Sequence, residues 1–323
     1  MVPRLSQQGE MLRRVCLARI AMARSALATR PSGDTAIHRA RQQAKRARAL
    51  LHLLRDALGT DRARTTSHAL RDVNRGLAAT RDAAVLAARL RIVAGDAGLT
   101  RREVRTLYGR LERAAGRLRG ASGCAQARRA LTAVETQVRG AVLAADGEVV
   151  LDGFLRIYRR GRRAYAAALA TPRAAPLHEW RKHVSRYWYV LEVLAPAQPR
   201  LLRPLARETH RLAELLGDFH NRSLLAAHVR RAGLAAPVER LLLRTIARQC
   251  VGLRDQALVV GARLYGPPPG RIAVPVRAWW RDWPGPEEVA SSRLSRTAAA
   301  TGGRRVARGR AAPPAGRSVR VRV

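Results

Sequence analysis

The sequence predicts an all-α protein that contains an internal duplication, and three observations support this prediction. Alanine, leucine and arginine dominate every long segment, and these residues favour helix. Apolar residues recur at spacings of three and four, as they do on helices that bury one face, and no segment has the pattern of a strand. A stretch of about twenty residues also occurs twice, at an offset of about 140 residues.

The repeated stretch covers residues 37–55 and returns over residues 177–194. Each copy opens with an aliphatic residue and a histidine, has arginines three and eight places after that histidine, and ends in leucine-rich sequence. A second pair of segments, 77–86 and 216–225, corresponds at an offset of 139 residues. Two correspondences at nearly one offset predict a duplicated unit of ordinary domain size. The matching basic positions are His38, Arg41 and Arg46 in the first copy and His178, Arg181 and Arg186 in the second.

Each copy is expected to be a helix with two neighbouring stripes. In the first copy an apolar column runs from Ile37 to Leu54, and a basic column follows one residue later, about 100° around the helix. Like charges one turn apart destabilise an isolated helix by a few tenths of a kcal/mol per pair. A solvated face is the ordinary interpretation of one such column, but its return in the second copy indicates an anionic partner. The first column consists of His38, Arg41, Lys45, Arg48 and His52.

The charge of the chain points to the same kind of partner. Its formal net charge is +39, from 62 Lys and Arg against 23 Asp and Glu. A compact domain with this charge repels itself unless a polyanion neutralises it, so nucleic acid, polyphosphate and an anionic membrane are the candidates. Arginine predominates, and its planar fork binds phosphate oxygens in a bidentate manner, although GC-rich coding would also enrich it.

The cysteines and the N-terminus indicate the cellular compartment. Cys16, Cys124 and Cys250 are far apart and odd in number, which fits neither a disulfide framework nor a zinc site. The N-terminal segment carries arginine throughout, and no run of 18 apolar residues occurs. We therefore expect a cytoplasmic protein that is neither secreted nor membrane-spanning.

The first half of the chain, 6–143, is predicted to hold six helices. Asp34 is expected to cap the basic helix at its start, and Gly59 can take the left-handed conformation at its end. Thr80 is expected to cap a later helix, and Thr100 with Glu103 forms a capping box. The last two helices have no counterpart at the repeat offset and are expected to bridge the halves. The expected helices cover residues 6–28, 35–58, 64–78, 81–93, 100–118 and 125–143.

The second half, 147–265, repeats this pattern and completes a helical domain over residues 1–265. Pro176 suits the first turn of the second basic helix, because the donor that proline lacks would be unpaired there. The expected helices cover residues 148–170, 176–195, 200–216, 221–231 and 237–264. The remaining segment, 266–323, contains 12 arginines against three acidic residues and is predicted to be a largely disordered basic tail. Its tryptophans are expected to dock on the helical body: Trp279, Trp280 and Trp283.

The basic helix that starts at a histidine and occurs twice, with an RD pair or its equivalent opening a later helix in each half, resembles the CHAD domain. This is a helical domain named for its conserved histidines, and the resemblance covers residues 6–264. It implies two similar helical bundles about a pseudo-twofold axis with a basic central surface or pore. It also implies binding of inorganic polyphosphate, in some bacteria on polyphosphate granules. The polyphosphate-binding residues that it implies are His38, Arg41, Lys45, Arg46, Arg48, Arg81, His178, Arg181, Lys182 and Arg186.

The second half departs from the family pattern at several positions. Ser185 and Trp188 stand where the family usually has basic residues, and Asn221 stands where an aspartate is common, matching Asp82 of the first half. These departures predict that the second half binds polyphosphate more weakly than the first.

The chain is expected to bind without catalysing a reaction and without a cofactor or a metal. No GxxxxGK[ST] loop, GxSxG elbow or HExxH motif occurs. Nucleic acid is the main alternative partner, since RNA or DNA could bind the same basic surface and tail. No aromatic residues for base stacking are interleaved with the basic column of the first half, whereas the second half has Tyr187, Trp188 and Tyr189. A scaffold that recruits granule-associated proteins through the tail is a third alternative.

Overall fold

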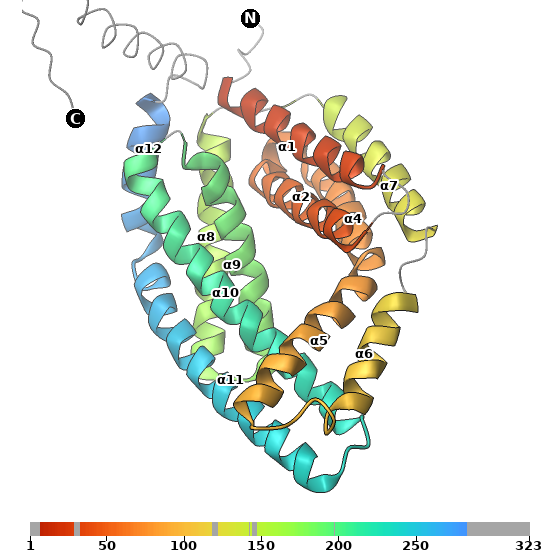
Figure 1. The fold of residues 1–323 in the computed structure, drawn as a ribbon. Helices are drawn as coiled ribbons and strands as arrows, with labels where there is room; N and C mark the ends of the chain where they lie inside the picture. The colour runs from red at the N-terminus through yellow and green to blue at the C-terminus, as the bar shows by residue number, and fades with distance from the viewer. Residues whose placement is uncertain are drawn as a thin grey trace, which may run out of the picture. The chain divides into compact units, whose positions relative to one another are not determined.

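The computed structural model describes residues 7–28, 33–117, 122–141, 143, 147–196 and 198–282. These residues form twelve helices and no strand, so the all-α prediction is confirmed. Figure 1 shows how the helices are arranged. None of these helices is long and apolar enough to cross a membrane. In the first half the helices are α1 (Gln7–Ala26), α2 (Asp34–Leu53), α3 (Arg55–Leu58), α4 (Thr60–Gly76), α5 (Ala78–Asp96), α6 (Arg105–Arg117) and α7 (Ser122–Arg139). In the second half they are α8 (Gly147–Ala170), α9 (Ala174–Leu194), α10 (Pro199–Arg230), α11 (Ala236–Tyr265) and α12 (Pro269–Asp282).

The basic helix α2 forms where the sequence predicts it. Its apolar column is buried, from Ile37 at 5% exposure to Leu54 at 0%. Gly33, not Asp34, is the capping residue, because Asp34 already belongs to the first turn. The chain bends at Leu54 into the short α3, and Gly59 has a φ of 80°, which lets the chain turn sharply into α4. The basic helix α2 therefore ends at Leu53, about one turn before the expected end near Gly59, and the short α3 covers the remaining turn.

The order and packing of the helices recur between the halves. The helices α8 and α9 begin 140 residues after α1 and α2 (147 − 7 and 174 − 34), and each pair packs together. Likewise α5 packs on α6 as α10 packs on α11, and α1 packs on α7 as α8 packs on α12. This makes α12 the counterpart of α7, although the two sequences share no motif.

The helix α12 corrects the predicted boundary of the tail at residue 266. Residues 269–282 form a helix that packs on α8. Val276 is only 4% exposed within the core, and Arg277 forms an ion pair with Glu148 of α8 at 3.3 Å. This helix was not predicted because its proline-rich composition is typical of disordered segments, although one of its faces is buried. The rest of the predicted tail, with Trp283, and the side chains of Trp279 and Trp280 lie outside the described residues.

The helix α10 is continuous where the sequence predicts two helices. Gly217 and Asp218 mark the expected break, since both residues disfavour helix interiors. Leu212, Leu216 and Phe219 are all at most 8% exposed, so one buried face runs through this position and keeps the helix intact. In the first half the corresponding stretch of chain is not one continuous helix, because it is interrupted at Leu77, between α4 and α5. The expected cap Thr80 lies inside α5, which begins two residues earlier.

A second hydrophobic cluster joins α5 and α6 to α10 and α11, next to the main core. It includes Leu90, Leu107, Val229 and Leu242. Arg110 of α6 also donates a hydrogen bond to the carbonyl of Ala232, at 2.8 Å. The helix α6 therefore bridges the halves as expected, whereas α7 packs on α1 and α4 of its own half.

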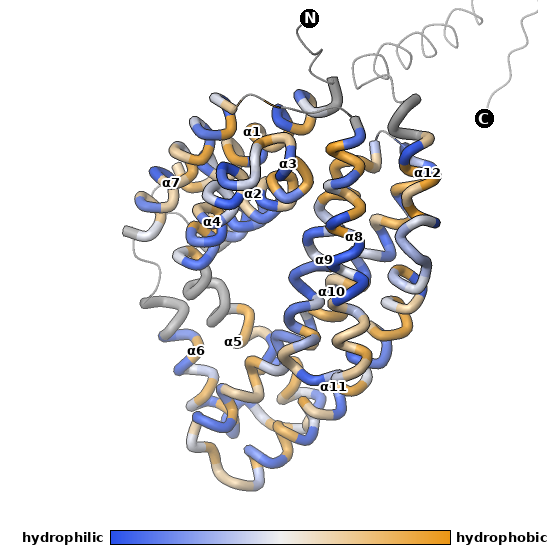
Figure 2. Tube along the Cα trace, turned by 180° about the vertical axis from the view of Figure 1, so that it is seen from behind, coloured by the Kyte–Doolittle hydropathy of each residue, from blue (hydrophilic) through white to orange (hydrophobic). Residues whose placement is uncertain are grey.

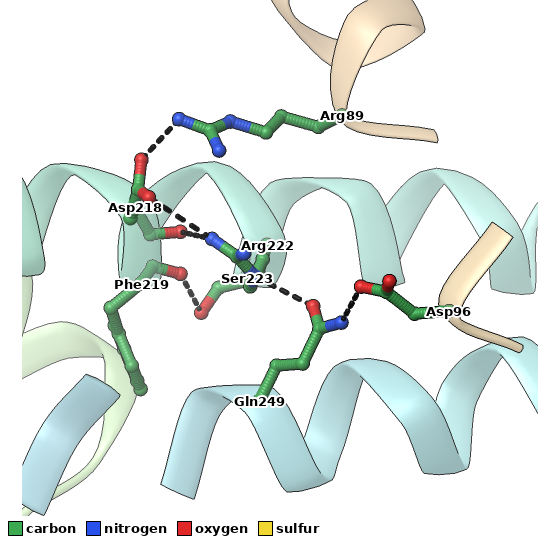
Figure 3. Close-up of polar contacts among 7 residues, drawn as sticks. All are labelled: Arg89, Asp96, Asp218, Phe219, Arg222, Ser223 and Gln249. Carbon is green, nitrogen blue, oxygen red and sulfur yellow. Dashed lines mark hydrogen bonds and ion pairs between the residues drawn. The ribbon is translucent and has the colours of Figure 1, made fainter. Parts of the chain in front are cut away.

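Polar contacts reinforce this junction, as Figure 3 shows. Asp218 of α10 pairs with Arg89 of α5 and with Arg222, one turn further along α10. Arg222 also donates to the side chain of Gln249 in α11 at 2.7 Å, and Gln249 donates to Asp96 of α5 at 2.7 Å. The contacts form one connected network that links α5 to both α10 and α11.

Candidate anion-binding cleft

A polar cleft of about 530 Å³ lies between α2 and α9 and is completed by residues of α10 and α5. In Figure 2 hydrophilic stretches of α2 and α9 border the space between the two halves. Six cationic side chains and two carboxylates line the cleft, together with four histidines. The cations are Arg41, Lys45, Arg48, Arg181, Lys182 and Arg186, and the carboxylates are Glu179 and Glu214. The histidines are His38, His183, His210 and His220.

Seven of the ten predicted site residues line this cleft: His38, Arg41, Lys45, Arg48, Arg181, Lys182 and Arg186. They come together because α2 and α9 pack against each other and their basic columns face the same space. The predicted residue Arg81 belongs to α5, but its side chain lies outside the described residues. The side chains of Arg46 and His178 are not part of the lining of the cleft.

Arg46 does not line the cleft, because its side chain is engaged by α9. Its guanidinium donates two hydrogen bonds to Glu192, with Nε–Oε2 and Nη2–Oε1 distances of 2.9 and 3.0 Å. It also lies over the rings of Trp188 and Tyr189, at 5.9 and 5.3 Å from their centroids. Arg46 thus ties α2 to α9 through a bidentate ion pair and two cation–π contacts.

His178 packs against His220 of α10 instead of lining the cleft itself. The two rings are 4.4 Å apart, and their Nδ1 atoms lie 3.2 Å from each other, so one ring donates to the other. Burial and the charges of Arg181 and Lys182 lower the pKa of His178. Burial and the charges of Arg181 and His178 lower the pKa of His220 to about 4. His220 is the member of the pair that faces the cleft.

Two cleft arginines also hold the backbone or side chains around them. Arg41 is 7% exposed, and its Nη1 donates at 3.0 Å to the carbonyl of Leu77, where the chain breaks between α4 and α5. Arg48 donates from Nε to Ser67 Oγ at 3.1 Å. Both arginines are therefore positioned by their neighbours before any ligand binds.

The cations at one end of the cleft are crowded. Burial and the charges of Arg48 and Arg160 lower the pKa of Arg186 to about 10. Burial and the charge of Arg71 lower the pKa of Arg48. A guanidinium whose pKa falls is one whose charge is poorly compensated by solvent and by counter-charges. A bound anion would supply that compensation, so this end of the cleft favours anionic ligands.

The carboxylates compensate part of the charge elsewhere in the cleft. Glu179 forms an ion pair with Lys182. Glu214 lies 3.9 Å from the Nε2 atom of His210. Among the described residues Arg48 and Arg186 form no such ion pair, although Asp72 partly offsets the charge on Arg48.

Sequence reasoning missed the three cleft histidines His183, His210 and His220. His183 lies off the basic column that the sequence defines, and burial with the charges of Arg186 and Arg160 lowers its pKa to about 4. The other two belong to α10, whose position across the cleft depends on tertiary packing. Conversely, His52 ends the predicted basic column but does not line the cleft; its Nε2 is 3.3 Å from Ser67 Oγ.

The aromatic residues of α9 differ in accessibility. Tyr187 is fully buried, so it is not available to stack on a base. Trp188 and Tyr189 do line the cleft, and Trp188 packs on the ring of His210 at 4.1 Å. The described residues contain no group of three side chains that could hold a metal ion.

Comparison with known proteins places this arrangement in a family. A search of curated proteins found no match. The fold is similar to that of PptA from Streptomyces chartreusis, with a TM-score of 0.61 and 18% sequence identity over 80% of this chain and 99% of that chain. The CHAD domain model matches residues 14–230, and CHAD domains are generally non-catalytic binding domains. Because this match spans more than half of the sequence, the chain belongs to the CHAD domain family.

Proposed function

We propose that this protein binds inorganic polyphosphate in the cleft between α2 and α9, without turning it over. The observation that carries the proposal is the convergence of six cationic side chains from two helices on one cleft, which two carboxylates line among the residues that the structure describes. The CHAD family is associated with polyphosphate binding, which supports this ligand among the polyanions that the charge allows.

The chemistry of the cleft suits a chain of phosphates. Polyphosphate offers charged oxygens along a flexible backbone and has no base edges to be read. Arginine forks bind such oxygens in a bidentate manner, and the crowded guanidiniums of Arg48 and Arg186 gain most from a counter-charge. The cleft has the volume of a small-ligand site, which admits a single flexible chain more easily than a nucleic-acid duplex.

Nucleic acid is the second candidate, and one observation favours it. Trp188 and Tyr189 line the cleft, and aromatic rings beside a basic groove are a feature of proteins that bind single strands. The contact of Trp188 with His210 argues against this role, because a base would have to displace that ring to stack there.

Competition binding tests the proposal with the full-length chain. Long-chain polyphosphate, single-stranded RNA and duplex DNA would compete at matched phosphate concentration and physiological salt. We expect polyphosphate to be preferred, with an affinity that falls as salt rises, as for other polyanion complexes. Replacing both Arg48 and Arg186 by glutamine should weaken polyphosphate binding by about a hundredfold or more, since hydrogen bonds between charged groups contribute about 1.5–3 kcal/mol each.

Two variants with the same change of charge serve as controls. Arg240→Gln/Arg244→Gln removes two exposed arginines of α11, and Arg304→Gln/Arg305→Gln removes two from the C-terminal segment. Both should bind nearly as the parent does. A preference for RNA or DNA, or an equal loss in the C-terminal variant, would show that the cleft is not the polyphosphate site.

The remaining parts of the proposal concern origin and location. The two halves derive from a duplicated unit with pseudo-twofold symmetry, which the matching starts and packing of α1–α2 and α8–α9 support. The proposed location is the cytoplasm, on polyphosphate granules, because the family is associated with binding of this polymer. Imaging of a fluorescent fusion beside stained granules tests it, and a diffuse signal would contradict it.

A further inference from the structure

A row of arginines on α8 lies outside the cleft. Arg156, Arg160 and Arg163 follow one another at spacings of four and three, so they share one face of the helix. At a rise of 1.5 Å per residue the row spans about 10 Å along the helix axis. Arg55 of α3 adds a fourth charge, because it is among the cations that lower the pKa of Arg160.

Contacts connect this row to the cleft. Arg156 donates from Nη2 to the carbonyl of His52 at 3.2 Å and forms an ion pair with Asp56 of α3. The Nε2 atom of His52 lies 3.3 Å from Ser67 Oγ, and the same hydroxyl accepts a hydrogen bond from the cleft residue Arg48. Three contacts, through His52 and Ser67, therefore connect Arg156 of the row to Arg48 in the lining of the cleft.

The charges of the row and the cleft also act on each other. Burial and the charges of Arg156, Arg55 and Arg163 lower the pKa of Arg160, while Asp56 partly offsets them. Arg160 in turn lowers the pKa of Arg186, which lines the cleft. Arg160 thus links the row to Arg186 in one region of positive charge, in which Arg156 is paired with Asp56.

The fold itself does not require arginines on this face. The helix α1 is the counterpart of α8, and its buried residues Leu12, Cys16, Ile20 and Ala23 align with the buried residues Val150, Phe154, Tyr158 and Gly161 at an offset of 138. This alignment places Ala18, Met22 and Ser25 at the positions of the arginine row. The equivalent helix thus folds with uncharged residues there, and the like charges of α8 are mutually destabilising unless they bind an anion.

We propose that the arginine row of α8 extends the cleft, so that a long polyphosphate chain leaves the cleft past Arg186 and continues over Arg160 and Arg163. This inference rests on the proposed function and adds a preference for chain length. A short oligomer fills the cleft alone, whereas a long chain contacts both regions. The affinity for long chains then exceeds that for short ones by the contribution of the row.

The test compares tripolyphosphate with long-chain polyphosphate, each titrated into the full-length protein by calorimetry. In Arg160→Gln/Arg163→Gln we expect the affinity for the long chain to fall about tenfold, roughly threefold for each partly exposed arginine. The affinity for tripolyphosphate should change by less than about twofold. The control Arg240→Gln/Arg244→Gln removes the same charge from α11 and should leave both affinities unchanged. Each expected change is the ratio of the variant's affinity to the parent's affinity for the same ligand, so the number of binding sites along a long chain cancels.

The outcomes separate the two proposals. Equal losses for both ligands, or no loss for either, would overturn the extension while leaving binding in the cleft intact. Failure of the parent protein to bind either phosphate would overturn the proposed function itself. The charge reversal Arg160→Glu/Arg163→Glu should deepen the loss for the long chain alone, and thermal unfolding of each variant establishes that it is folded.

Discussion

Acidification is expected to strengthen polyphosphate binding, because the folded protein depresses the pKa of two cleft histidines. The pKa of His183 falls to about 4 through burial and the charges of Arg186 and Arg160, to which Lys182 adds a smaller lowering, while Glu179 partly offsets the shift. The pKa of His220 also falls to about 4, through burial and the charges of Arg181 and His178. Both rings are therefore neutral near pH 7, and an anion bound beside them would favour their charged forms.

The size of the effect follows from linkage. If a bound anion returns the pKa of one histidine from about 4 to about 6.5, its complex gains roughly one proton and its affinity rises about tenfold between pH 7.5 and 5.5. Solvent reaches both rings in part and screens the charges, so roughly three- to tenfold per histidine is expected.

The free protein responds to acid with the opposite sign. A histidine whose pKa is lower in the folded than in the unfolded state contributes no destabilisation above about pH 6.5. As the pH falls from 6.5 towards 4, the unfolded state takes up the proton first, and the folded state loses stability. Acid should therefore lower the melting temperature of the free protein while it tightens the complex.

Dissociation constants measured at pH 7.5, 6.5 and 5.5 and constant ionic strength test this prediction. Long chains are the better ligand, because few of their phosphates are terminal groups that take up protons near pH 6. His183→Gln/His220→Gln should flatten the profile, whereas the control His68→Gln, at an exposed position of α4, should keep it. A double variant that retains the slope of the parent would refute the assignment, as would an affinity that falls in acid.

Three further predictions concern stability, each measured by denaturant unfolding. Glu192→Gln should lower the free energy of unfolding by about 1 kcal/mol, because it breaks the bidentate pair with Arg46, whose side chain is 13% exposed; an unchanged midpoint would mean that the pair contributes nothing. Gly153→Ala should cost about 1–3 kcal/mol, since its Cβ would lie 2.1 Å from the carbonyl oxygen of Leu53, whereas Gly252→Ala, with open space around it, should be neutral or stabilising. Asp218→Asn should cost about 1–2 kcal/mol by weakening its contacts with Arg89 and Arg222, and a matching loss in Arg89→Gln would show that both act through one network.

The parts of the fold that the sequence predicts are those with a local signal. The columns of α2 and α9 are visible because buried and basic positions recur within one helix, and seven of the ten predicted site residues do line the cleft. The continuity of α10 and the helix α12 were missed for the opposite reason. Gly217 and Pro275 disfavour helix locally, but buried neighbours such as Phe219 and Val276 hold the chain helical.

The histidines of α10 and the pairing of Arg46 depend on contacts between distant segments. His220 meets His178 across 42 residues, and Arg46 meets Glu192 across 146 residues. A single sequence carries no periodic signal for such contacts. The repeat offset matched Arg46 to Arg186 and so placed it with the cleft arginines, although Arg46 lies off the basic column of α2.

One difference between the halves explains why Arg186 lines the cleft while its counterpart Arg46 does not. At the repeat offset of 140, Arg46 corresponds to Arg186, and Glu192 corresponds to His52. Arg46 therefore pairs with the carboxylate of Glu192 across the α2–α9 contact, whereas the residue near Arg186 is the histidine His52.

That histidine supplies no negative charge. Burial and the charges of Arg186 and Arg48 lower the pKa of His52 to about 2, so His52 stays neutral near Arg186. Arg186 consequently keeps a charge that no carboxylate among the described residues pairs with, and an anion in the cleft can compensate it. At Ser185 and Trp188 the chain departs from the family pattern, and α9 has fewer basic residues as a result. Because His52 stands where the other half has Glu192, Arg186 nevertheless stays available to a ligand in the cleft.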